Sequence, residues 1–155
     1  MKKVLGLVVI VFMTMISITA NAQSNEAFYA RGGYSDVTGF VAGEYVVGST
    51  GFAFGWHNYS PPGANETASS FDVALTLYGG PYYENSYYLS TGYASTNSAL
   101  IMNGTVEEWD GTWSIIGGYK WGSDFMDVKI GCGYLWSDIT DGVAVDFSVG
   151  IVLFN

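Results

Sequence analysis

Large apolar residues alternate with small or charged ones between Phe125 and the end of the chain. Between 126 and 136 the large apolar residues stand at even positions, and between 143 and 153 they stand at odd positions. Because successive side chains of a β-strand point to opposite faces, this period of two predicts two strands, each with one large apolar face. Each run is also long enough to cross a bilayer as a tilted strand, which takes about 9–11 residues.

The same alternation, bounded by turn residues, recurs along the chain and predicts eight strands and no helix after residue 23. The predicted strands are 26–35, 38–48, 50–59, 68–79, 84–96, 111–122, 125–137 and 141–154. The predicted fold class is all-β, an eight-stranded antiparallel up-and-down transmembrane β-barrel. The two long connections, 60–69 and 97–110, both follow odd-numbered strands, as extracellular loops do when the N-terminus is periplasmic.

The second face of the predicted strands carries the charged residues. By parity, it holds Arg31, Glu44, His57, Asp72, Lys120, Asp127, Lys129 and Asp146, separated mostly by Gly, Ala and Ser. An eight-stranded barrel has an interior just wide enough for its own side chains. Charges in such a place must be paired or hydrated. We therefore expect these eight residues to form a charge network that fills the lumen.

Residues 1–22 are predicted to be a cleaved signal peptide. Lys2 and Lys3 precede an apolar run from Val4 to Ile18, and Ala20-Asn21-Ala22 has the A-x-A form of a cleavage site. Residues 23–155, about 130 in number, are predicted to form one outer-membrane β-barrel domain. The expected location is the outer membrane of a Gram-negative bacterium, with the barrel present as a monomer among membrane lipids.

The charge balance excludes one class of function and weakens another fold. After residue 22 the basic residues are Arg31, Lys120 and Lys129, against fourteen Asp and Glu, whereas nucleic-acid binding needs basic clusters. The alternative fold is a soluble barrel with its aromatic residues inside. Its water-facing surface would consist of Gly, Ala and Ser, although soluble surfaces are typically about a quarter or more charged. Tyr and Trp near the predicted strand ends instead suit the aromatic belts of a membrane barrel.

The hairpin GGYKWGSDFMDVKIGCGYLW and the end SVGIVLFN, with the signal peptide and the strand count, carry a family resemblance. The whole mature chain resembles the small eight-stranded outer-membrane barrels of the OmpX-like and opacity-protein-like group. The resemblance implies a structural, adhesive or protective role. Barrels of this group usually end on an aromatic residue that faces lipid. The alternation instead predicts that Phe154 shares the inner face, opposite Leu153.

His57 is the one histidine of the chain and the candidate base for an enzyme. The deacylase of this barrel group carries His-x-Ser on a late strand, whereas here Ser60 follows an early strand and Glu66 comes later. We expect no catalysis and no cofactor. A lipid A-modifying enzyme using His57, or a narrow-pore channel, is the alternative. Cys132 is expected to face lipid as a small apolar side chain, and the carboxylates at 107, 108 and 110 to be a solvated rim rather than a metal site.

The connection 97–110 is predicted to be a protruding surface ribbon. Asn103-Gly104 suits a type I′ hairpin turn, and the ribbon carries Leu100, Met102 and Trp109. The parity of the two flanking strands requires one bulge, expected at Gly111. The outer loops hold Asp36, Glu66, Glu107, Glu108, Asp110, Asp138 and Asp141. The expected partner is therefore an extracellular protein or host surface that is basic or bridged by cations.

Overall fold

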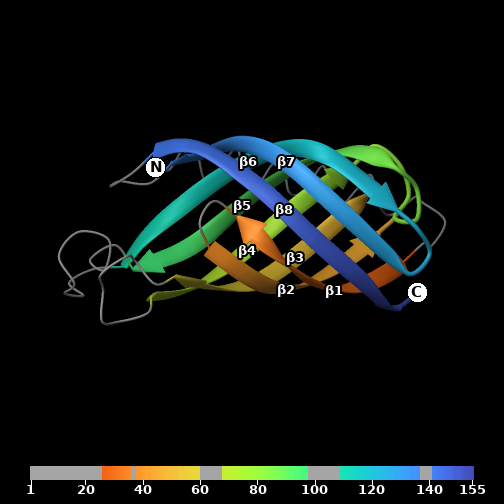
Figure 1. The fold of residues 1–155 in the computed structure, drawn as a ribbon, viewed down its shortest axis with the longest axis horizontal. Coiled ribbons are helices and arrows are strands. Elements are labelled where there is room, and N and C mark those ends of the chain that lie inside the picture. The colour runs from red at the N-terminus through yellow and green to blue at the C-terminus, as the bar shows by residue number, and fades with distance from the viewer. Residues whose placement is uncertain (1–25, 36–37, 60–67, 98–108, 137–140) are drawn as a thin grey trace.

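A computed structural model of the chain describes residues 26–35, 38–59, 68–97, 109–136 and 141–155 (Figure 1). Its strands are β1 (Glu26–Ser35), β2 (Thr38–Val47), β3 (Thr50–Tyr59), β4 (Ala68–Tyr78), β5 (Ser86–Asn97), β6 (Trp109–Gly122), β7 (Met126–Trp136) and β8 (Asp141–Phe154). Each strand pairs antiparallel with the next, and β1 also pairs with β8, so the sheet closes into a barrel. The predicted eight-stranded up-and-down barrel is confirmed. The predicted signal peptide lies outside the described residues.

The barrel has two unlike ends, which we call the turn end and the loop end. At the turn end, on the right in Figure 1, β1 starts and β8 finishes, and the connections 48–49, 79–85 and 123–125 join the strands. Gly48 has a φ of 60°, a left-handed conformation that glycine adopts without steric cost and that tight hairpin turns require. The other ends of the strands, including Ser35, Tyr59, Asn97 and Trp136, form the loop end.

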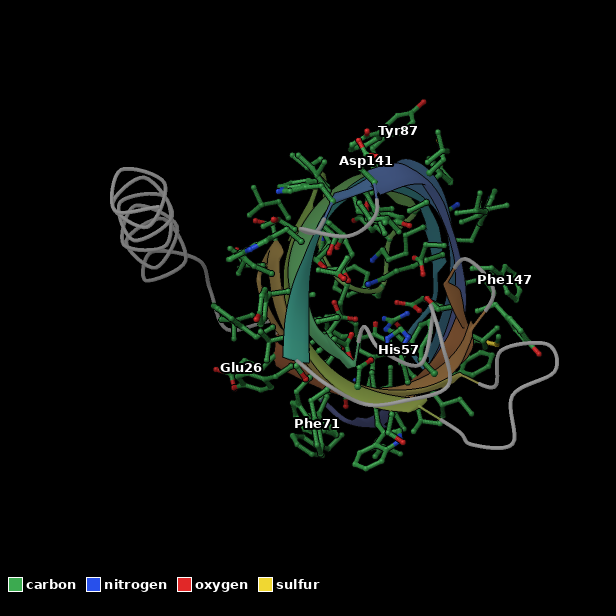
Figure 2. All side chains as sticks on the ribbon, turned by 90° about the vertical axis from the view of Figure 1, so that its left-hand side faces the viewer. Glu26, His57, Phe71, Tyr87, Asp141 and Phe147 are labelled. Carbon is green, nitrogen blue, oxygen red and sulfur yellow. The ribbon has the colours of Figure 1, made fainter. Side chains whose placement is uncertain are left out.

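The two faces of the wall differ in polarity. Outward side chains are apolar and exposed, among them Phe71 (61%), Val73 (57%) and Ile151 (57%). Inward ones include buried charges such as Glu44 (0%) and Lys120 (1%). Figure 2, drawn along the barrel, shows Phe71, Tyr87 and Phe147 pointing away from the ring of strands and His57 inside it. No helix in the described part of the chain is long and apolar enough to span a membrane.

A bulge near the end of β8 corrects the predicted side of Phe154. Tyr29 lies opposite Val152, but the next residue of β1, Phe28, lies opposite Phe154, so Leu153 is the extra residue. The bulge turns both Leu153 and Phe154 outward, each 60% exposed. Phe154 stacks on Phe28, with ring centroids 5.3 Å apart. A bulge changes the parity of every residue beyond it, so an aromatic side chain ends the outer face after all.

The bulge predicted at Gly111 is wrong. The β5–β6 ladder keeps one register from Ser86 opposite Lys120 to Asn97 opposite Trp109, and Ser95 lies opposite Gly111 within it. The missing side chain of Gly111 makes room for the ring of Tyr93 instead, because a Cβ there would lie 2.5 Å from Tyr93 Cζ. Side-chain packing therefore accounts for this glycine. The Asn103-Gly104 turn lies outside the described residues.

Candidate functional site

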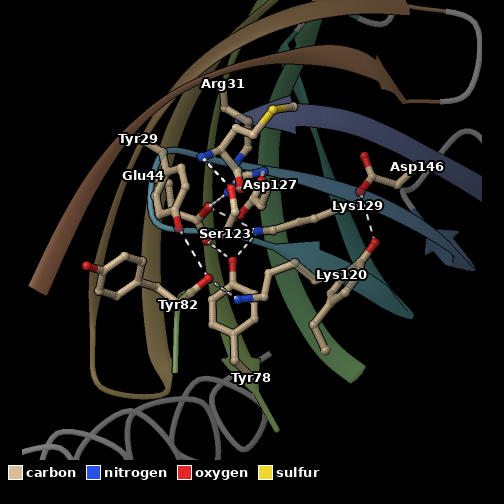
Figure 3. A network of polar contacts seen from close by, with 12 residues as sticks. Tyr29, Arg31, Glu44, Tyr78, Tyr82, Lys120, Ser123, Asp127, Lys129 and Asp146 are labelled. Carbon is tan, nitrogen blue, oxygen red and sulfur yellow. Dashed lines mark hydrogen bonds and ion pairs between the residues drawn. The ribbon is translucent and has the colours of Figure 1, made fainter. Parts of the chain in front are cut away.

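A cluster of ion pairs fills the lumen near the turn end (Figure 3). We call Arg31, Glu44, Tyr78, Asp127 and Lys129 the polar cluster. The Arg31 guanidinium donates two parallel hydrogen bonds to Asp127, Nη1 to Oδ1 at 2.6 Å and Nη2 to Oδ2 at 2.8 Å. Arg31 Nη2 also lies 2.6 Å from Glu44 Oε2. Lys129 Nζ donates to both oxygens of Glu44 at 3.0 and 3.1 Å, and the Tyr78 hydroxyl contacts both Glu44 and Lys129.

The polar cluster is sealed from solvent. The four charged side chains expose between 1% and 6% of their surface. Two cations and two anions cancel in formal charge. Burial of an ion is costly unless the ion is paired and its remaining hydrogen-bonding capacity is used. The bidentate Arg31–Asp127 pair and the three contacts at Glu44 meet most of that requirement, although Arg31 Nε has no partner among the described residues.

The connection between β4 and β5 folds into the turn end and covers the polar cluster. We call residues 79–85 the tyrosine cap. Tyr82 is 7% exposed, and its carbonyl oxygen accepts hydrogen bonds from Lys120 Nζ at 2.5 Å and from the Tyr29 hydroxyl at 3.4 Å. Lys120 also donates to Pro81 O at 3.1 Å, and Asn155 Nδ2 donates to the Tyr82 hydroxyl at 2.9 Å. The cap is thus tied to β1, β6 and the last residue of the chain.

Glycines on β6 and β8 make this packing possible. A Cβ on Gly150 would lie 2.8 Å from Asp127 Oδ1 and 2.9 Å from Arg31 Cζ. A Cβ on Gly122 would lie 2.8 Å from the carbonyl oxygens of Tyr82 and Glu84. Real Cβ atoms do not approach so closely, so the inward glycines of β6 and β8 provide the space that the ion pairs and the cap occupy.

Asp146 lies apart from the polar cluster and pairs with a tyrosine. The Tyr88 hydroxyl donates to Asp146 Oδ2 at 3.1 Å. A Cβ on Gly118 would lie 2.7 Å from Tyr88 Cε1, so the ring lies where Gly118 has no side chain. Lys129 Nζ is 5.5 Å from the centre of the same ring, which connects Asp146 to the polar cluster through a cation–π contact.

His57 and Asp72 form a separate pair towards the loop end. His57 Nε2 lies 3.2 Å from Asp72 Oδ2, and the two side chains are 16% and 24% exposed. Phe40 stacks on the His57 ring, with centroids 5.1 Å apart. Asp72 Oδ1 is buried and has no hydrogen-bond partner in the described part of the chain. On β4, Ser70 stands directly opposite His57.

The eight charged residues singled out from the sequence therefore divide into four groups. Arg31, Glu44, Asp127 and Lys129 meet in the polar cluster. Lys120 binds backbone carbonyls of the cap, Asp146 binds Tyr88, and His57 binds Asp72. Parity had placed Tyr29 on the inner face, but sequence reasoning missed the tyrosines at 78, 82 and 88, although the parity of β4 and β5 already placed Tyr78 and Tyr88 on the inner face as well. Nothing marked the cap as inward-folding.

The described residues offer no group of three or more His, Cys, Asp or Glu side chains that could hold a metal ion. Leu100 and Met102 of the predicted surface ribbon lie outside the described residues, and Trp109 is described only as the first backbone position of β6. Cys132 is exposed on the outer face of β7.

A closed eight-stranded barrel with an apolar outside and ion pairs inside defines the class of protein. No family model and no curated protein matches the sequence. Among solved structures, the chain is similar to the N-terminal β-barrel domain of Pseudomonas aeruginosa OprF, with 14% identity and a TM-score of 0.60 over 84% of this chain and 98% of that one. It is also similar to neisserial surface protein A, with 16% identity and a TM-score of 0.49 over 83% and 94%. The chain has the fold of the small eight-stranded outer-membrane barrels.

Proposed function

We propose that the protein is an integral barrel of a bacterial outer membrane, closed to solutes, with a structural or surface-interaction role. The observation that carries the proposal is the inversion of polarity across the wall. Phe71, Val73 and Ile151 would face water in a soluble protein, while Glu44, Lys120 and Asp127 are buried inside. A lipid environment accounts for this inverted polarity, because each described strand pairs with two neighbours in a closed sheet.

Two belts of aromatic residues on the outer face support the same placement. Towards the loop end the belt contains Tyr34, Trp56, Phe71, Tyr93, Trp113, Tyr134 and Trp136, and towards the turn end Phe28, Tyr45, Tyr87, Tyr119, Trp121 and Phe154. Tyr and Trp favour the membrane–water interface because one end of the ring system is apolar and the other is polar. Between the belts the outer positions are aliphatic or phenylalanine, such as Val73, Ile115 and Phe54.

The placement is tested by fractionation and by the gel behaviour of the folded chain. We expect the protein in the outer-membrane fraction, and a shift in its mobility in SDS when the sample is boiled, because closed barrels resist SDS until heated. Recovery in the soluble periplasmic fraction, without a heat-dependent shift, would overturn the proposal.

If the lumen is closed, any interaction with a partner should involve the outer loops. The polar cluster and the tyrosine cap occupy the turn end, and in this proposal their side chains block the passage of solutes there. The acidic loops and the surface ribbon with Leu100, Met102 and Trp109 are then the parts available for contact with an extracellular protein or host surface. Supporting this, their composition combines negative charge with apolar side chains.

A second candidate function, lipid A modification, is favoured by the His57–Asp72 pair. A base oriented by a carboxylate is two-thirds of a hydrolytic triad, and Ser70 opposite His57 is the serine that the register supplies. Under this alternative, His57→Ala and Ser70→Ala would each abolish a change in lipid A that the wild-type protein produces in cells. Identical lipid A profiles with and without the wild-type protein would exclude it.

A further inference from the structure

The barrel closes between β1 and β8, which are neighbours in the sheet but lie at opposite ends of the strand order. Every other pair of neighbouring strands follows directly in sequence, so a short connection limits how far the two strands can separate. The pair β1 and β8, which we call the closing seam, has no such link. Its ladder is also interrupted at the turn end, where Leu153 is the extra residue of a bulge.

The bulge changes the direction of the side chain at position 155. Val152 faces the lumen and packs against the buried core, so in a regular strand position 155 would face outward. Because Leu153 is an extra residue, Phe154 points outward and Asn155 points back towards the lumen. There Asn155 Nδ2 donates a hydrogen bond to the Tyr82 hydroxyl of the tyrosine cap at 2.9 Å. The bulge therefore brings the end of β8 into contact with the cap.

The same tyrosine also contacts the other strand of the closing seam. The hydroxyl of Tyr29, a buried residue of β1, donates to the Tyr82 carbonyl at 3.4 Å (Figure 3). The two rings pack edge to face, with centroids 6.4 Å apart. One residue of the cap is thus bonded to β1 through Tyr29 and to the end of β8 through Asn155.

The cap is anchored away from the closing seam. It connects β4 and β5, which lie across the barrel from β8 and β1 in the order of strands. Lys120 of β6 donates to the carbonyl oxygens of Pro81 and Tyr82, and the Gly122 N–H donates to Asn85 Oδ1 at 3.0 Å. The cap therefore spans the lumen from a fixed base, and β1 and β8 cannot separate at the turn end without breaking a contact to it.

The outer side of the closing seam has a contact of a different kind. Phe28 of β1 stacks on Phe154 of β8, with centroids 5.3 Å apart. In a lipid environment apolar side chains gain packing from such a stack but no hydrophobic free energy, because the lipid is as apolar as the rings. The hydrogen bonds of Tyr82 are directional and lie inside the lumen, so they are the contacts that specify a closed seam.

We propose that Tyr82, Tyr29 and Asn155 form a latch that holds the closing seam shut at the turn end. Proteins open locally where the fewest contacts hold an element, and the free energy of that opening is set by the contacts that break. The latch raises this free energy at the one place where neighbouring strands are not joined in sequence. It is a property of the folded barrel and is independent of the role proposed above.

The test is amide hydrogen exchange of the folded barrel in dodecyl maltoside micelles, measured by NMR. Tyr82→Phe and Asn155→Ala each remove the hydrogen bond between these two side chains and leave the backbone unchanged. Exchange in the β1–β8 ladder, at 28–31 and 150–154, should become about threefold faster, as expected for loss of one hydrogen bond. The hairpin end between β2 and β3, at 46–52, should be unaffected. The double variant should exchange no faster than the faster single variant, because both substitutions remove the same bond.

Tyr83→Phe is the matched control, since the hydroxyl of Tyr83 has no hydrogen bond within the described part of the chain. Three outcomes would overturn the latch: unchanged exchange at the closing seam, equal acceleration at 46–52, or the same acceleration in Tyr83→Phe. Asn155 is exposed, so Asn155→Ala leaves the packing of the wall intact. It therefore decides the result even where Tyr82→Phe disturbs the cap.

Discussion

Arg31 contacts two carboxylates at once, Asp127 by two hydrogen bonds and Glu44 by an ion pair. Lys129 contacts one carboxylate, Glu44, which keeps Arg31 and Tyr78 as partners when Lys129 is absent. The two cations are therefore not equivalent, although both are buried in one cluster.

We expect Arg31→Met to destabilise the barrel more than Lys129→Met. Loss of one partner of a buried ion pair typically costs about 3–5 kcal/mol, because the other charge is left uncompensated. Arg31→Met leaves Asp127 without its cation and should fall at or above the upper end of that range. Lys129→Met should fall at or below the lower end. The measurement is the free energy of unfolding by urea in lipid vesicles. Equal decreases in the two variants would contradict the inequality of the two cations.

The side of the wall that these charged residues face was predictable from alternation alone, whereas their partners were not. Arg31 and Asp127 come from β1 and β7, and Glu44 and Lys129 from β2 and β7. Which inward residues meet across a barrel depends on the tilt and stagger of the strands, and no local pattern carries that information. For the same reason Lys120 was expected in the charge network, but its ammonium binds the carbonyls of Pro81 and Tyr82.

Among the elements, the tyrosine cap depends on one glycine of β6. We expect Gly122→Ala to displace the cap, since its Cβ would lie 2.8 Å from the carbonyl oxygens of Tyr82 and Glu84. The cost should be about 1–3 kcal/mol, as for other substitutions that overfill a packed site. The readout is hydrogen exchange at the amide of Glu84, which donates to Pro81 O at 3.1 Å and should exchange faster.

Gly117→Ala on the same strand is the matched control. A Cβ there would meet only the carbonyl oxygen of Tyr88, at an ordinary 3.9 Å. Exchange at Glu84 should then be unchanged. Equal acceleration in both variants would show that β6 responds to any added methyl group and that the cap has no special dependence on Gly122.

The surface ribbon is predicted to be dispensable for folding. Deleting residues 99–106 and rejoining the chain should leave the heat-dependent gel shift intact, because the β5–β6 ladder is already complete from Asn97 opposite Trp109 to Ser86 opposite Lys120. Binding to a partner or host surface should be lost. Retained binding, together with lipid A that is altered only when His57 is present, would favour the enzyme instead.

Strand order and strand limits followed from the sequence because a period of two and turn residues are local signals. Two irregularities did not. The bulge at Leu153 shifts the pairing register by one residue. The alternation of apolar and small residues before it shows no sign of the shift, so Phe154 was predicted on the inner face. A turn was recognised at Gly79-Gly80-Pro81, with the next strand starting at 84 rather than at Ser86, but turn residues do not indicate whether a turn points into the lumen or away from it.

At the scale of the whole molecule, the lumen is expected to be closed. Purified wild-type protein in a planar lipid bilayer should give no steady single-channel conductance, because the polar cluster and the cap together occupy the turn end. A bilayer exposed to detergent buffer alone is the control for leakage. Regular conductance steps that appear only with the protein would contradict a filled interior and support the narrow-pore alternative.

The composition of the polar cluster has a consequence for how the chain reaches its membrane. Its members belong to β1, β2, β4 and β7, so an assembly intermediate that lacks the later strands holds Arg31 and Glu44 without Asp127 and Lys129. Arg31 and Glu44 would then have only each other as charged partners, and the hydrogen-bonding capacity that Asp127 and Lys129 normally meet would be left unsatisfied in an apolar medium, which is costly. Assembly should therefore be all-or-none, with partly inserted chains returned to water rather than trapped in lipid. The buried charges are fully paired only when all eight strands are in place, so only the completed barrel should be stable in the membrane.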